Sequence, residues 1–140
     1  MIPDVLFIME DVASFQYFFY YPLLMLHRQG KIRLEVNLES IINSYKHFNL
    51  GHLTIFSRSH SQKTTENISS IKRAGIPHVF ENDDDLFQYR IDYSEQKDIT
   101  QTSLDRLTYE INNASLVLTF PQKMSERVRT LTTYTHENNL

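Results

Sequence analysis

The stretch SIKRAGIPHVFENDDDLF, residues 70–87, decides the fold, because it joins a helix to a buried strand and the strand to an acidic segment. The helix is predicted over residues 61–74, where it has basic residues in its last turn and is ended by Gly75 and Pro77. The apolar run IPHVFE, residues 76–81, follows at once and predicts a strand. A helix that leads directly into a buried strand is typical of a parallel sheet.

Strand and helix signals alternate on both sides of this stretch. The other runs that predict strands are DVLFIM (residues 4–9), KIRLEVN (31–37), HLTIFS (52–57) and LVLTF (116–120). Helices are predicted over residues 14–30, 38–48 and 102–115, and a last helix opens at Pro121. This alternation predicts an α/β fold: a doubly wound, mostly parallel five-stranded sheet with helices on both faces, Rossmann-like, with residues 31–37 at or near its edge.

Local signals refine these elements. Ser14 is the expected N-cap of the first helix, and Pro22 is expected to bend it. Thr102 with Asp105 resembles a capping box in which Asp replaces the usual Glu. An apolar face is expected on the last helix at Met124, Val128 and Leu131. The chain length predicts a single domain over residues 1–134, followed by a tail over residues 135–140.

Composition excludes several classes of function. The 14 Lys and Arg residues are scattered in a chain of net charge −3, so no nucleic acid partner is expected. The absence of cysteine excludes disulfides and cysteine-ligated zinc, and the three glycines form no phosphate-binding pattern. No apolar run reaches the roughly 18 residues that cross a bilayer. A cytoplasmic protein without a transmembrane helix is therefore expected, and contact with a membrane surface stays open.

Polar residues are expected to converge at one edge of the sheet. In open parallel sheets, ligands bind at the carboxyl ends of the strands, near the point where the strand order reverses. Glu81 belongs to the residues that close the predicted strands. The candidates for lining a cleft there are Glu10, Asp11, Arg58, Asp83, Asp84, Asp85 and Thr119.

The three consecutive aspartates allow three interpretations. The first, which we prefer, is a solvated turn in which one carboxylate caps the following segment. The second takes Asp83 and Asp85 as a D-x-D pair that chelates Mg²⁺ or Mn²⁺ on a diphosphate. The third pairs the aspartates with Arg58 across neighbouring strand ends. We assign no metal site and no catalytic residue.

The histidines and aromatic residues give no further site. The six histidines show no H-E-x-x-H spacing, and His78 is expected in or near the core because it stands within an apolar strand. The phenylalanines of the run from Phe15 to Tyr21 are also expected in the core, whereas its tyrosines could stack on sugar rings or contact a partner domain.

The order of several motifs resembles a known family. FSR ends a strand at Arg58, IKRAGIPHVFENDDDLF follows a helix, and INNASLVLTFPQKMSERV comes later. This order resembles the N-terminal, acceptor-side half of a GT-B glycosyltransferase of the glycosyltransferase 4-like family. The resemblance runs from about Phe56 onward and, more loosely, includes the first strand. The chain departs from the family after that strand, where MEDVASFQYFFYYP replaces a small or glycine-containing loop.

The resemblance implies a function in two parts. A glycosyltransferase that builds surface polysaccharide or another glycan would bind its sugar acceptor on this half. The nucleotide sugar would bind to a second domain, for which 140 residues leave no room. The resemblance therefore implies no cofactor in this chain, a donor-binding C-terminal domain or second subunit as its partner, and little activity alone.

Three other classes of function compete with it. A phosphoacceptor receiver domain would need an aspartate where Arg58 follows the third strand, so we reject it. A Toprim-like phosphoryl-transfer domain could hold Mg²⁺ with Glu10, Asp83 and Asp85, although no basic groove accompanies them. A non-catalytic interaction or scaffold domain stays the main alternative.

Overall fold

The computed structural model describes residues 1–9, 20–38, 52–58, 61–82, 86–88, 99–119 and 122–131. The strands in these ranges are β1 (Asp4–Met9), β2 (Arg33–Leu38), β3 (His52–Ser57), β4 (His78–Glu81) and β5 (Leu116–Leu118). The helices are α1 (Tyr20–Arg28), α2 (Gln62–Arg73), α4 (Gln101–Asn113) and α5 (Gln122–Leu131). The predicted N-cap Ser14, residues 39–48 of the helix predicted over 38–48, and the tail lie outside the described residues.

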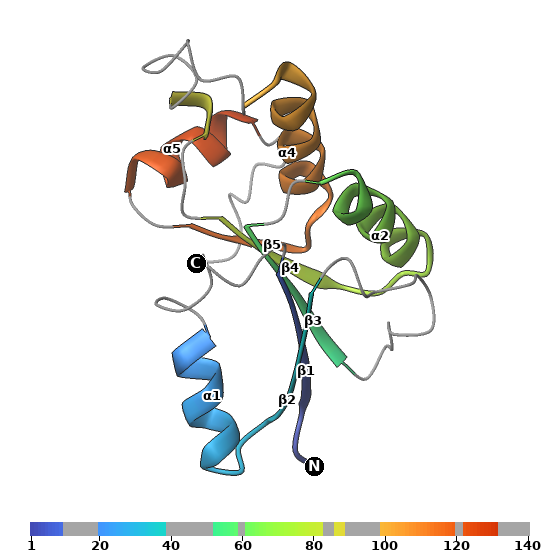
Figure 1. The fold of residues 1–140 in the computed structure, drawn as a ribbon, viewed down its shortest axis with the longest axis vertical. Coiled ribbons are helices and arrows are strands. Elements are labelled where there is room, and N and C mark those ends of the chain that lie inside the picture. The colour runs from blue at the N-terminus through green and yellow to red at the C-terminus, as the bar shows by residue number, and fades with distance from the viewer. Residues whose placement is uncertain are drawn as a thin grey trace.

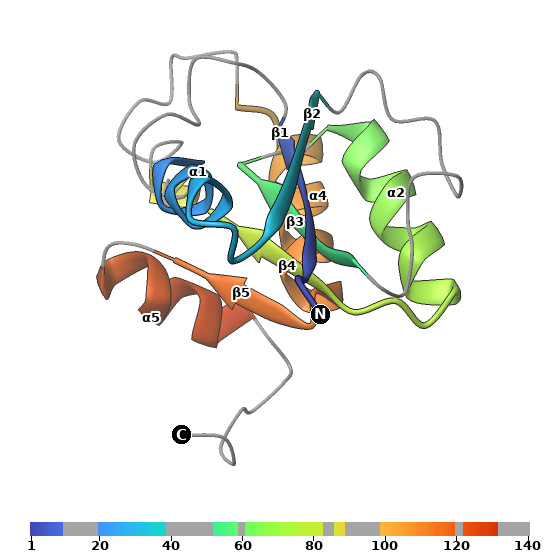
Figure 2. The same ribbon diagram turned by 90° about the horizontal axis from the view of Figure 1, so that it is seen from below.

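The strands form one sheet in the order β2-β1-β3-β4-β5, and every neighbouring pair is parallel. This arrangement confirms the predicted doubly wound α/β fold, with β2 at an edge. Figure 1 shows α2, α4 and α5 on one side of the sheet and α1 on the other. Figure 2 gives the same arrangement seen from below, with α1 and α2 on opposite sides of β1 and β2.

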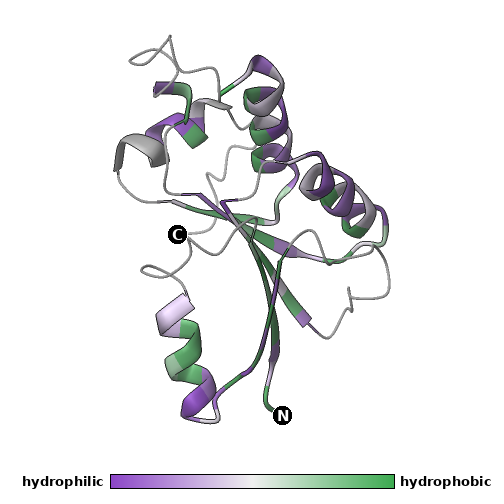
Figure 3. Cartoon of the chain, in the orientation of Figure 1, coloured by the Kyte–Doolittle hydropathy of each residue, from purple (hydrophilic) through white to green (hydrophobic). Residues whose placement is uncertain are grey.

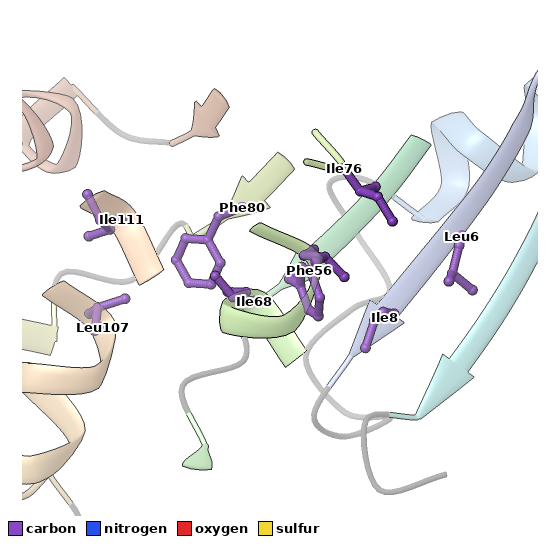
Figure 4. Packing of buried hydrophobic residues seen from close by; sticks show 9 residues of the cluster. Leu6, Ile8, Phe56, Ile68, Ile76, Phe80, Leu107 and Ile111 are labelled. Carbon is purple, nitrogen blue, oxygen red and sulfur yellow. The ribbon is translucent and has the colours of Figure 1, made fainter. Parts of the chain in front are cut away.

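Side chains alternate between two apolar layers, as the pleat of a strand requires. Leu6 and Ile8 of β1 join the layer under α2 and α4, whereas Val5, Phe7 and Met9 join the layer under α1. Figure 4 shows Phe80 of β4 between side chains of α2 and α4 in the first layer. Figure 3 shows the apolar residues concentrated on the central strands. Buried apolar residues on both faces explain why β1 reads as a continuous apolar run.

The helix ends follow from particular residues. Ser61 caps α2 by accepting a hydrogen bond from the Thr64 N–H at 3.2 Å, and Gly75 after the helix has φ +70°. Both ends of this helix were predicted. At α4 the predicted capping box is wrong, because the hydroxyl of Thr100, not of Thr102, accepts the Ser103 N–H at 3.1 Å.

Two further expectations are corrected or refined. Leu38, predicted to open a helix, is the last residue of β2 and pairs with Met9. Pro22 belongs to α1, but the residues before Tyr20 lie outside the described part of the chain, and with them the predicted bend. The α1 helix ends before Gly30, whose φ of +68° makes it the left-handed residue after the helix.

Charged residues tie the strands together at the amino end of the sheet. Arg33 of β2 donates two hydrogen bonds to the Asp4 carboxylate of β1, one of them at 2.8 Å from Nη2, and His52 of β3 lies 3.8 Å from it. The bond from Arg33 holds the pKa of Asp4 below its ordinary value. These charges lie at the amino ends of the strands, opposite to the carboxyl edge of the sheet.

Candidate functional site

The candidate site is the carboxyl edge of the sheet at β3, β4 and β5. The chain first builds β2 on one side of β1 and then returns to build β3 on the other side, so the strand order reverses between β1 and β3. This reversal opens the crevice in which doubly wound sheets bind ligands. We use the name edge rim for the residues that close these three strands or follow them directly, namely Ser57, Arg58, Glu81, Asn82 and Thr119.

Glu81 is the buried acid of the edge rim. It is the last residue of β4 and is 2% exposed, and it lies beside Ser57 of β3, which is 4% exposed. The Ser57 hydroxyl donates a hydrogen bond to the Glu81 carboxylate at 2.5 Å. A carboxylate is costly to bury unless donors compensate it, so this bond helps to hold the acid in place.

Arg58 follows β3 with a left-handed backbone. Its φ is +50°, and its backbone N–H donates a hydrogen bond to the Glu81 carbonyl at 2.8 Å. A residue with a side chain is disfavoured in this conformation by about 1 to 2 kcal/mol. The Arg58 side chain is half-buried. Glu81 thus contacts two consecutive residues of the neighbouring strand, one through its side chain and one through its backbone.

Asn82 and Thr119 continue the edge rim toward β5. The Asn82 N–H donates a hydrogen bond to the Leu118 carbonyl at 3.0 Å, and Asn82 is 2% exposed. Thr119 follows Leu118 and is half-buried. The ends of three adjacent strands are therefore joined by backbone hydrogen bonds that extend beyond the strands themselves.

The structure places part of the predicted site. Arg58 and Thr119 lie at the same edge of the sheet, as expected. The other candidates, Glu10, Asp11 and Asp83 to Asp85, lie outside the described residues, and with them the three interpretations of the aspartates. Within the described part of the chain, no group of three or more metal-binding side chains could hold an ion.

The pairing of Ser57 with Glu81 was missed in the sequence. Ser57 stands two residues after Ile55 and Glu81 two residues after Val79, and Ile55 and Val79 are paired in the sheet. Given this pairing, the alternation of side chains along a strand puts both polar side chains on one face, at the same level. Both residues end predicted strands, but local sequence patterns do not show that these two strands are neighbours in the sheet.

His78 lies at the opposite end of β4 and is buried, as predicted. Neither ring nitrogen has a hydrogen bond of good geometry among the described residues. Burial lowers the pKa of the imidazole to about 4, a shift that the backbone of Ile76 opposes and Lys72 reinforces. The ring meets Phe56 edge to face at 5.8 Å between centroids. His78 is thus a neutral core residue outside the edge rim.

Comparisons with known proteins add little to this geometry. No family model matches the chain, and no curated protein matches it. Among solved structures, the chain is similar to a conserved protein from Enterococcus faecalis, with 12% sequence identity, a TM-score of 0.40, and 93% of this chain and 99% of that chain covered. In the described residues, no helix has the length and hydropathy to span a bilayer.

Proposed function

We propose that the chain is the acceptor-side domain or subunit of a glycosyltransferase, and that the edge rim binds the sugar acceptor. The observation that carries the proposal is the set of polar contacts that Ser57 and Arg58 make with Glu81 at the ends of β3 and β4, next to the reversal of strand order between β1 and β3. Sugars are bound by several directed hydrogen bonds to hydroxyl groups. Arg58 and Thr119 are the half-buried members of the edge rim and offer a guanidinium group and a hydroxyl, whereas Ser57, Glu81 and Asn82 are buried and hold the strand ends. The resemblance of the motifs around Arg58 and residues 114–121 supports the same assignment.

The proposal divides the reaction between this chain and a partner. A donor-binding C-terminal domain or second subunit supplies the nucleotide sugar, and this chain positions the acceptor hydroxyl that attacks it. A general base must lie within hydrogen-bond reach of that hydroxyl. Synthesis of surface polysaccharide or another glycan is the process that fits such a division.

Calorimetric titration of the purified chain tests this function. Oligosaccharide fragments should bind with millimolar to micromolar dissociation constants, and nucleotide sugars should not bind, with or without Mg²⁺ or Mn²⁺. The variant Thr119→Val keeps the side-chain shape at the edge rim, removes one hydroxyl and should weaken the binding of oligosaccharides. Metal-dependent binding of a nucleotide sugar that disappears in an Asp83→Ala/Asp85→Ala variant would instead place the donor on this chain.

A non-catalytic interaction domain is the second candidate. Leu53 and Leu116, on β3 and β5, are 44% and 49% exposed, and their register with Val5 and Val79 puts both on the α1 face of the sheet. Exposed apolar side chains favour contact with another protein. An NMR titration with sugars distinguishes the two functions. An acceptor-binding domain should show shifts of the Arg58 and Thr119 amide signals, whereas an interaction domain should leave these signals unchanged.

A further inference from the structure

Arg58 has an unusual backbone for its residue type. Among the described residues, left-handed φ angles occur at Gly30, Gly75 and Arg58, so the chain uses glycine at two of the three positions. Glycine adopts this conformation without the steric penalty that a side chain incurs. Arginine at the third position therefore keeps a side chain where the backbone disfavours one.

The position of Arg58 is as specific as its conformation. It directly follows β3, the strand that borders the reversal of strand order. Its backbone is held by the Glu81 carbonyl, and the preceding Ser57 is held by the Glu81 carboxylate. Sparsely populated backbone conformations persist where the surroundings enforce them, and they cluster at ligand-binding sites.

We propose that Arg58 binds an oxyanion, a phosphate or a carboxylate, carried by the sugar acceptor. This inference rests on the proposed function of the edge rim. The guanidinium group offers parallel N–H donors that match two oxygens of such an anion, which a single ammonium group cannot do. Glu81 acts as the positioning residue, since it fixes the backbone from which the guanidinium extends.

Titrations followed by NMR on the full chain test the inference. The probes are glucose, glucose 1-phosphate, glucuronate and inorganic phosphate at constant ionic strength. At least one charged sugar should bind about 30-fold more tightly than glucose, and the signals of Arg58 should shift. The advantage should vanish in Arg58→Ala and Arg58→Gly and persist in Arg73→Ala, which removes an exposed arginine at the end of α2. Tighter binding of glucose 1-phosphate or of glucuronate shows whether the anion on the acceptor is a phosphate or a carboxylate.

A comparison of the two Arg58 variants measures the cost of the left-handed backbone separately from the loss of the guanidinium group. Both remove the guanidinium group, but only glycine relieves the left-handed conformation, so the Arg58→Gly variant should melt about 3 °C above the Arg58→Ala variant. Equal melting temperatures, or charged-sugar binding that survives in Arg58→Ala, would overturn the inference. If all sugars bind equally and shift the Thr119 amide, the inference fails and the proposed function stands. If no sugar shifts any edge-rim signal, both are rejected.

Discussion

At the scale of the residue, Glu81 joins the stability of the sheet to the candidate site. Its side chain is buried against the end of β3, where apolar Ile55 and Val79 precede it on the same face. The fold alone would favour an apolar residue at such a position, because replacing buried charges by apolar groups is often neutral or stabilising. A buried acid at the carboxyl edge of the sheet is therefore better explained by the candidate site than by the needs of the fold.

The Ser57 hydroxyl should contribute measurably to stability. Ser57→Ala removes the hydrogen bond to the buried Glu81 carboxylate and should lower the free energy of unfolding by about 1.5 to 3 kcal/mol, the usual range for hydrogen bonds to charged groups. Denaturation by urea, followed by circular dichroism, measures the change. Ser70→Ala is the control, since that hydroxyl bonds the Glu66 carbonyl on the exposed surface of α2. A loss no larger than in this control would contradict the prediction.

His78 should make the protein less stable in mild acid. Its pKa is about 4 in the folded protein and near the ordinary 6.5 when unfolded, so the unfolded chain binds more protons between these values. The contribution of the neutral ring to the free energy of unfolding is fully present above pH 6.5 and is lost as the pH falls toward 4. The loss amounts to about 3 kcal/mol at 1.36 kcal/mol per pH unit.

A pH series of urea denaturations on the wild type and His78→Leu measures this effect. The variant should show a flatter dependence of stability on pH between 4 and 6.5. The other five histidines are present in both proteins, so the difference between the two curves isolates His78. Parallel curves would show that the ring does not resist protonation in the folded protein.

At the scale of the element, the sequence predicts the exact bounds of β1 and β3, whereas β2 and β4 each begin two residues later than predicted. β3 has the predicted bounds, because its apolar run is flanked by polar residues. The α2 helix is also located to within a residue at each end, since Ser61 and Gly75 are unambiguous signals. The start of α4 was misplaced because several hydroxyl residues precede it, and any of them could serve as the cap. Only the backbone conformation, extended at Thr100, decides between them.

The corrected cap of α4 gives a direct test. Thr100→Ala removes the side chain that accepts the Ser103 N–H and should lower stability by about 1 kcal/mol. Thr102→Ala changes an exposed threonine within the helix and should be neutral or slightly stabilising, because alanine is the better helix former. Thermal denaturation of both variants compares them. A larger loss for Thr102→Ala would restore the capping box suggested by the sequence.

At the scale of the whole molecule, alternation of strands and helices was sufficient to predict the sheet but not the complete site. Parallel strands end at a common edge, so Arg58 and Thr119 could be placed together without coordinates. The pairing of β3 with β4 was also needed to bring Ser57 to Glu81, and strand order is not written in local patterns. The left-handed backbone of Arg58 gave no signal, because sequence patterns predict such a conformation at glycine rather than at arginine.

The two apolar layers should unfold together, because they share the central strands. Phe7 supports the layer under α1 and Phe80 the layer under α2 and α4, and each is fully buried. Phe7→Leu and Phe80→Leu should each lower the free energy of unfolding by about 1 to 2 kcal/mol. Each variant should keep one transition that coincides in circular dichroism and tyrosine fluorescence. Leu116→Ala, at an exposed edge position, should change stability by less than about 1 kcal/mol. Separate transitions in Phe7→Leu would show that α1 and β2 unfold independently of the rest of the sheet.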